Sequence, residues 1–133
     1  MVKPGKTPLR VLVAEDSDEG FQLFRAYLQG QPLILSHAVN GADALGLAKT
    51  GTFDLVFMDA HMPVMDGYES ANRIRQWEAL QNGPRIPIVF LSADDLEEQI
   101  RQDTMGSGSG HLSKPYVKDE LLEAIRLYSM PQP

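Results

Sequence analysis

Short apolar runs alternate along the whole chain with segments of helical periodicity, and this alternation limits the fold more than any other feature. The runs are apolar at consecutive positions, which is typical of strands buried on both faces. The expected strands cover residues 9–14, 33–38, 53–58, 86–91 and 111–113, and the expected helices cover residues 18–28, 40–49, 68–80, 94–103 and 118–128. Because strands that alternate with helices form a parallel sheet with helices on both sides, the sequence predicts a doubly wound α/β domain.

Chain length and composition indicate a single domain outside the membrane. The 133 residues suffice for one core and are too few for two ordinary domains. We expect the domain to cover residues 8–129, with short flexible ends at 1–7 and 130–133. The chain has no cysteine, its start lacks the apolar core of a secretory signal, and no apolar run approaches the ~20 residues that cross a bilayer. These features favour the cytoplasm and argue against membrane insertion.

The net charge of the chain indicates which kinds of partner it can bind. The 12 basic residues are outnumbered by 18 acidic ones, the formal charge is −6, and no stripe of Lys and Arg is present to follow a phosphate backbone. We therefore expect no direct contact with nucleic acid. Converging carboxylates can instead concentrate a divalent cation, so the positions of the acidic residues matter.

Polar residues follow the expected strands at their carboxyl ends, where ligands bind in doubly wound sheets. They are Glu15, Asp16, Asp59, Ser92 and Lys114. Three neighbouring carboxylates repel one another unless a cation lies among them, and Mg²⁺ prefers such ligands. Any one of these acids alone is more often solvated or a helix cap, but the three together favour a metal site.

Two of these residues could contact a bound phosphoryl group. Lys114 can pair with the acidic cluster through its ammonium, although a surface lysine would look the same in sequence. Ser92 offers a hydroxyl, and it equally suits the N-cap of the helix that follows.

Four motifs in order give the chain a family resemblance. They are VLVAEDSD, DLVFMDAHMPVMDGYE, IPIVFLSA and HLSKPY, each at the end of an expected strand. Together they resemble the receiver domain of bacterial two-component response regulators, with features of the receivers in hybrid sensor kinases, over residues 9–128. The resemblance implies a flavodoxin-like sheet of strand order 2-1-3-4-5 with five helices in three layers.

The resemblance also implies a phosphorylation chemistry. Asp59 would take a phosphoryl group from a phosphohistidine of a sensor histidine kinase or a histidine phosphotransfer protein. Mg²⁺, for which Mn²⁺ can substitute, would be held by Asp16 and Asp59 directly, by Glu15 through water, and by the backbone carbonyl of His61. Such a protein is a signalling switch that catalyses only its own phosphorylation and dephosphorylation.

Further residues receive roles from the same resemblance. Ser92 and Lys114 would bind phosphoryl oxygens, together with the backbone N–H groups of His61 and Ala93. The Lys114–Pro115 bond would be cis. Gly67 would shape the loop after the acceptor by adopting backbone angles that larger residues resist.

Two positions depart from the family pattern. Glu15 stands where many receivers have aspartate, which favours contact with the metal through water. His111 occupies the place of the switch aromatic, usually Tyr or Phe, that works with Ser92. A downstream partner would bind the face formed by the fourth helix, the fifth strand and the fifth helix.

Two alternatives to the receiver function remain open at the level of sequence. The first is a Mg²⁺-dependent phosphatase or phosphotransferase with an aspartate nucleophile. Such enzymes usually carry a second carboxylate two residues after the nucleophile, where this chain has His61, and a cap, for which no insertion is long enough. The second is a receiver-like module that only binds, which normally lacks the acceptor or the lysine. Few residues follow 128, so the chain is either a stand-alone regulator or a piece of a larger protein.

Overall fold

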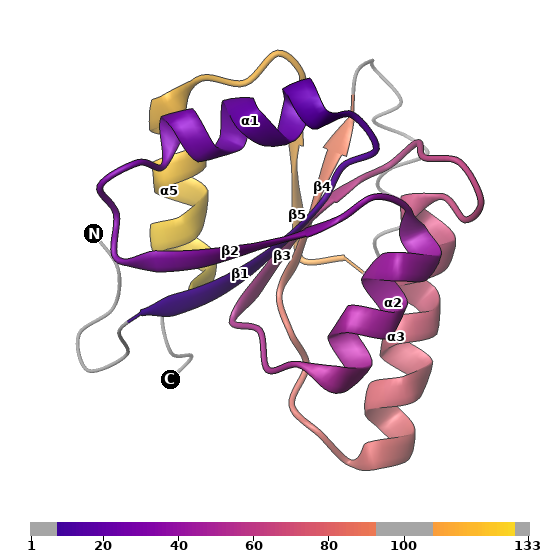
Figure 1. Ribbon diagram of the computed structural model, residues 1–133. Helices are drawn as coiled ribbons and strands as arrows, with labels where there is room; N and C mark the ends of the chain where they lie inside the picture. The colour runs from indigo at the N-terminus through magenta and orange to yellow at the C-terminus, as the bar shows by residue number, and fades with distance from the viewer. Residues whose placement is uncertain (1–7, 93–107, 130–133) are drawn as a thin grey trace.

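The computed structural model describes residues 8–92 and 108–129, which form an α/β domain (Figure 1). Its strands form one parallel sheet in the order β2-β1-β3-β4-β5. The strands are β1 (Leu9–Ala14), β2 (Leu33–Ala38), β3 (Leu55–Asp59), β4 (Ile88–Ser92) and β5 (Gly110–Ser113). The predicted fold class and strand order are confirmed.

Helices cover both faces of this sheet. They are α1 (Asp18–Tyr27), α2 (Gly41–Thr50), α3 (Gly67–Gln81) and α5 (Lys118–Ser129). Figure 1 shows α1 and α5 on one side of the sheet and α2 and α3 on the other. The helix predicted over 94–103 and the ends predicted to be flexible lie outside the described residues. Within 8–92 and 108–129, no helix has the length and apolar character to span a membrane.

The core has two halves because successive side chains of a strand point to opposite faces. In β1, Leu12 and Ala14 pack on the α2 and α3 side, whereas Val11 and Val13 pack on the α1 and α5 side. All five residues of β3 are buried, as expected for the central strand of the sheet. This two-sided burial explains why the strands are apolar at consecutive positions.

Polar side chains fix the starts of three helices. Ser17, Asn40 and Asp66 each accept a backbone N–H from three residues further along, at 2.8, 2.7 and 2.8 Å. Such caps satisfy N–H groups that have no partner within the helix. Ser17 therefore begins α1 directly after the acidic pair, which holds that pair at the end of β1.

Two strands begin later than their apolar runs predict. β3 and β4 each start two residues further on and end one residue further on, so Asp59 and Ser92 are the last residues of their strands. At β4 the reason is local. Ile86 donates its backbone N–H to the buried carboxylate of Glu78 at 2.9 Å, and Pro87 has no N–H to donate.

Gly67 and Gly46 provide a test of close packing. A Cβ at Gly67 would lie 2.1 Å from the carbonyl oxygen of Asp59, whereas a Cβ at Gly46, inside α2, meets nothing within 4 Å. We expect Gly67→Ala to lower the free energy of unfolding by about 1–3 kcal/mol through overpacking. Gly46→Ala should raise it by about 0.5–1 kcal/mol because alanine favours the helix. Urea unfolding of both variants measures this, and equal effects of the two substitutions would contradict it.

Candidate functional site

The three acids predicted to converge do meet at the carboxyl edge of the sheet. Glu15 and Asp16 follow β1, and Asp59 ends β3. One carboxylate oxygen from each residue lies within 4.8 Å of the other two. Glu15 and Asp59 are each 5% exposed, whereas Asp16 is open to solvent. One small cation can therefore reach all three from the solvent side.

Lys114 brings the positive charge to this cluster. Its Nζ lies 2.9 Å from Oδ2 of Asp59 and 3.7 Å from Oε1 of Glu15. Its backbone N–H donates to the carbonyl oxygen of Ser92 at 2.7 Å, which fixes the lysine beside the end of β4. The bond between Lys114 and Pro115 is cis, as the resemblance implied. An exposed surface lysine, the alternative reading of the sequence, is thereby ruled out.

The charges in this cluster do not balance. Burial raises the pKa of Glu15, and the nearby charge of Asp59 raises it further, while Lys114 acts in the opposite direction. Burial lowers the pKa of Lys114, but the hydrogen bond to Asp59 and the charges of Asp59, Glu15 and Asp16 together outweigh this and leave the pKa raised. The single ammonium of Lys114 thus faces three carboxylates, and a divalent cation would reduce the repulsion that remains among them.

The loop after β3 holds Asp59 from the other side. His61 donates its backbone N–H to Oδ1 of Asp59 at 3.2 Å. Ala60 donates to the carbonyl oxygen of Leu91 at 2.8 Å and accepts from the N–H of Gly67 at 3.0 Å. Both oxygens of the Asp59 carboxylate therefore face donors, Lys114 on one and His61 on the other.

The reason predicted for Gly67 was wrong. It does not adopt a positive φ, and among the described glycines only Gly30 does. Gly67 is required instead because the start of α3 passes so close to the backbone of Asp59 that no side chain fits. The left-handed position in this loop belongs to Val64, with a φ of 72°.

The other predicted site residues are placed as follows. Ser92 is buried at the end of β4, and its carbonyl accepts the Lys114 N–H. His111 is exposed on β5, where it lines a groove against α5, so it does not join the acidic cluster in this structure. Ala93 lies outside the described residues.

His37 is a neighbour of the site that the sequence did not single out. Its Nε2 lies 2.7 Å from the backbone carbonyl oxygen of Glu15, and its ring stacks on Phe21 with centroids 4.0 Å apart. A lone histidine near the end of a strand carries no signal in sequence. Only the pairing of β2 with β1 brings it beside Glu15.

A doubly wound sheet with acids and a lysine at its carboxyl edge is the arrangement predicted from the four motifs, and comparison with known families agrees. The model of the response regulator receiver domain matches residues 11–126. The chain therefore belongs to the response regulator receiver domain family.

Relatives and solved structures resemble this chain over most of its length. The chain is 34% identical to the sensor histidine kinase GacS of Pseudomonas protegens over 116 residues, which cover 87% of this chain and 13% of that kinase. This chain therefore corresponds to only 13% of the length of that kinase.

Two solved structures are similar in both fold and sequence. One is the receiver domain of Ssk1 of Saccharomyces cerevisiae in complex with the phosphotransfer protein Ypd1, with a TM-score of 0.85, 26% identity, and coverage of 92% of this chain and 90% of that one. The other is the receiver domain of the sensor histidine kinase PA1611 of Pseudomonas aeruginosa, with magnesium in its active-site cleft. It has a TM-score of 0.78, 26% identity, and coverage of 91% and 97%.

The acidic cluster predicts a stabilising effect of Mg²⁺. At ten times its dissociation constant the ion should stabilise the fold by about 1.4 kcal/mol, seen as a rise of roughly 5 °C in Tm. Asp16→Asn should abolish most of this rise and change the metal-free protein little, because Asp16 is exposed. Since the pKa of Glu15 is raised, protons should compete with the ion up to a higher pH than at an ordinary glutamate.

Asp18→Asn is the matched control, because Asp18 is an exposed acid of the same segment outside the cluster. Thermal melts with MgCl₂, compared with NaCl of equal ionic strength, measure the effect. An equal rise in Asp16→Asn and the native protein would contradict a site at this cluster.

Proposed function

We propose that this receiver domain accepts a phosphoryl group on Asp59, in a reaction that depends on Mg²⁺, and changes conformation in response. The observation that carries the proposal is the environment of the Asp59 carboxylate. It ends a fully buried strand, contacts Lys114 at 2.9 Å, and shares a solvent-facing cluster with Glu15 and Asp16. Family membership supports the same chemistry.

The cation would be held by the carboxylates of Asp16 and Asp59, with Glu15 acting through water and the His61 carbonyl completing the protein ligands. The oxygen donors and their mutual spacing fit a hard divalent ion, as in the receiver of PA1611 that contains magnesium. When bound, Mg²⁺ neutralises charge on the transferring phosphoryl group. Mn²⁺ offers the same preference for oxygen and could substitute.

The protein's own residues supply positioning and charge. An oxygen of Asp59 forms a bond to phosphorus as the bond from phosphorus to the donor imidazole breaks, and the imidazole leaves neutral when its other nitrogen carries a proton. Lys114 then pairs with a phosphoryl oxygen instead of the free carboxylate. The hydroxyl of Ser92 and the backbone N–H groups of His61 and Ala93 bind the others.

The phosphoryl donor would be a sensor histidine kinase or a histidine phosphotransfer protein. The complex of Ypd1 with the Ssk1 receiver provides the precedent. In this chain, a groove of about 430 Å³ lies beside Glu15 and Lys114 and is lined by Leu23, Tyr27 and Tyr116 among others. Leu23 is 42% exposed. These side chains would contact the donor and align its histidine with Asp59.

The output would pass through the face that contains β5 and α5. Inward movement of Ser92 toward the phosphoryl group would shift an equilibrium between two packings of this face. His111 lines a groove of about 390 Å³ there, with Leu127 and Tyr128 of α5. The fourth predicted helix of this face lies outside the described residues. A signalling role without turnover of an external substrate, a cytoplasmic location and the lack of direct nucleic-acid binding stay predictions.

The direct test is phosphorylation by a small donor. After incubation with Mg²⁺ and acetyl phosphate or phosphoramidate, the intact mass should increase by one phosphoryl group. The increase should be absent in Asp59→Asn and retained in Asp119→Asn, an exposed acid of α5. No adduct in the native protein, an adduct in Asp59→Asn, or steady turnover of unrelated phosphate esters would overturn the proposal.

Lys114 should affect the transfer step more than metal binding. We expect Lys114→Met to slow adduct formation about 100-fold, because it removes a preorganised positive group from the transition state. It should leave Mg²⁺ affinity equal or higher, since an ammonium that competes for Asp59 is lost. Lys118→Met, an exposed lysine at the start of α5, is the control. A loss of Mg²⁺ binding parallel to the loss of rate would contradict this division.

A further inference from the structure

The outer edge of β2 lacks the features that usually protect an exposed strand. β2 and β5 are the two edges of the sheet, and β5 has only four residues. β2 pairs with β1 in unbroken register over its six residues. Its sequence, LILSHA, contains no proline, lysine or acidic residue. Natural edges are normally blocked by charges, proline or bulges, so β2 is open to pairing with another strand.

The backbone of β2 presents unused groups along this edge. The N–H of Leu9 donates to Pro32 O at 3.1 Å, and the N–H of Glu15 donates to Ala38 O at 2.9 Å. The backbone N–H and C=O groups of the even-numbered residues of β2 therefore point toward β1. Because these groups point to opposite edges in successive residues, those of Leu35 and His37 point away from β1. In the part of the chain that the structure describes, no hydrogen bond is recorded for either N–H.

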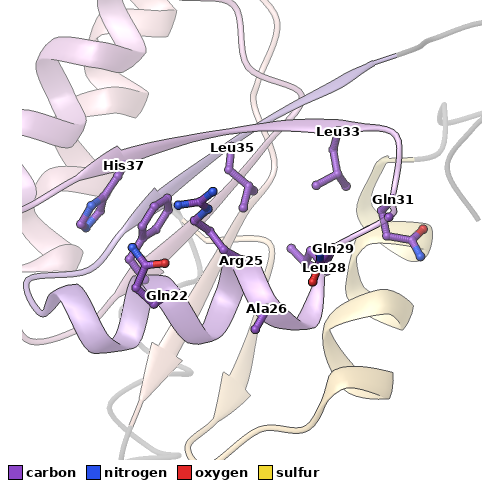
Figure 2. Close-up of a pocket in the computed structure, with 11 residues that line it drawn as sticks. Gln22, Arg25, Ala26, Leu28, Gln29, Gln31, Leu33, Leu35 and His37 are labelled. Carbon is purple, nitrogen blue, oxygen red and sulfur yellow. The ribbon is translucent and has the colours of Figure 1, made fainter.

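A groove runs beside this edge, between β2 and α1 (Figure 2). Its volume is about 740 Å³. Leu33 and Leu35 point into it from β2, and the side chain of Arg25 extends from α1 toward the strand. Ile34, on the opposite face of the same strand, is 47% exposed. The edge is thus flanked by apolar side chains on both faces.

The charge of the groove is opposite to that of the whole chain. Its lining includes the cation Arg25 and no aspartate or glutamate, although the chain carries a formal charge of −6. An acidic side chain laid along β2 would therefore meet a cation and no repelling carboxylate from the lining.

We propose that the open edge of β2, with the groove between β2 and α1, binds an extended segment of a partner protein as an added strand. The segment would alternate apolar and acidic residues. The six residues of β2 span about 20 Å at ~3.3 Å per residue, enough for a segment of similar length. Backbone hydrogen bonds would come from Leu35 and His37, and Arg25 would select for an acidic side chain.

A second copy of the chain fits this edge less well. Its own β2 contains no acidic residue to meet Arg25, and pairing two β2 edges would bring two such cationic grooves together. Each copy also carries a net negative charge. The charges therefore favour a different, acidic partner. Because none of this involves Asp59, the proposal does not depend on phosphoryl transfer.

The test uses the full chain and a blocked synthetic peptide of six residues that alternates valine and glutamate. Amide hydrogen exchange is followed by NMR. With peptide at ten times its dissociation constant, exchange at Leu35 and His37 should slow about tenfold, because only the unbound protein exchanges freely. The amides of Ile34 and Ser36, which already face β1, should change much less.

Two variants and two further peptides separate the contribution of charge from that of backbone hydrogen bonds to peptide binding. Arg25→Glu should weaken binding of this peptide about three- to tenfold. Lys49→Glu should not, because Lys49 is the last-turn cation of α2 and lies outside the groove. A peptide with lysine in place of glutamate should bind the native protein more weakly and Arg25→Glu more strongly. A peptide with all of its amides methylated should not protect Leu35 or His37, because neither of its edges can then donate backbone hydrogen bonds.

Four results would overturn the proposal. They are no protection at millimolar peptide, equal binding of the methylated peptide, equal affinity in Arg25→Glu, and protection that grows with protein concentration in the absence of peptide. The last would identify a second copy of the chain as the occupant.

Discussion

The ion pair between Lys114 and Asp59 is the interaction on which the site depends. It joins the residue after β5 to the end of the central strand. The Nζ of Lys114 also lies 3.7 Å from Oε1 of a second buried carboxylate, that of Glu15. Placing such groups away from water costs free energy that their attraction need not recover. The cluster is therefore poorly explained by stability alone. The cluster carries an excess of negative charge, which a bound divalent cation would offset.

Backbone hydrogen bonds beyond the strand ends hold this pair in place. Lys114 is bonded to Ser92, and Ala60 to Leu91, so the sheet pairing continues into the loops that carry the functional groups. The close approach of Gly67 to Asp59 locks the start of α3 against the same strand end. The site is thus built from main-chain contacts, while the apolar core on either side supports the sheet that carries them.

The order of elements and the composition of the cluster were predictable, and the details that failed have identifiable causes. Strand limits at β4 shifted because Ile86 gives its N–H to Glu78, a contact between residues eight positions apart that an apolar run does not reveal. The role of Gly67 was misjudged because its constraint is the proximity of Asp59, not its own backbone angles. His111 is exposed in this structure. Its predicted role as the switch residue that works with Ser92 stays a prediction.

By itself the sequence determined, to within one residue, which residues lie at the carboxyl end of each strand, because two-sided burial requires a run of consecutive apolar residues that polar residues bring to an end. A parallel sheet then places all those residues at one edge, so the acids and the lysine could be grouped without coordinates. Only the tertiary structure decided how they pair, since the distance from Lys114 to Asp59 depends on contacts between residues 55 positions apart. The same holds for His37 beside Glu15 and for the open edge of β2, which exist only once β2 is paired with β1 on one side alone.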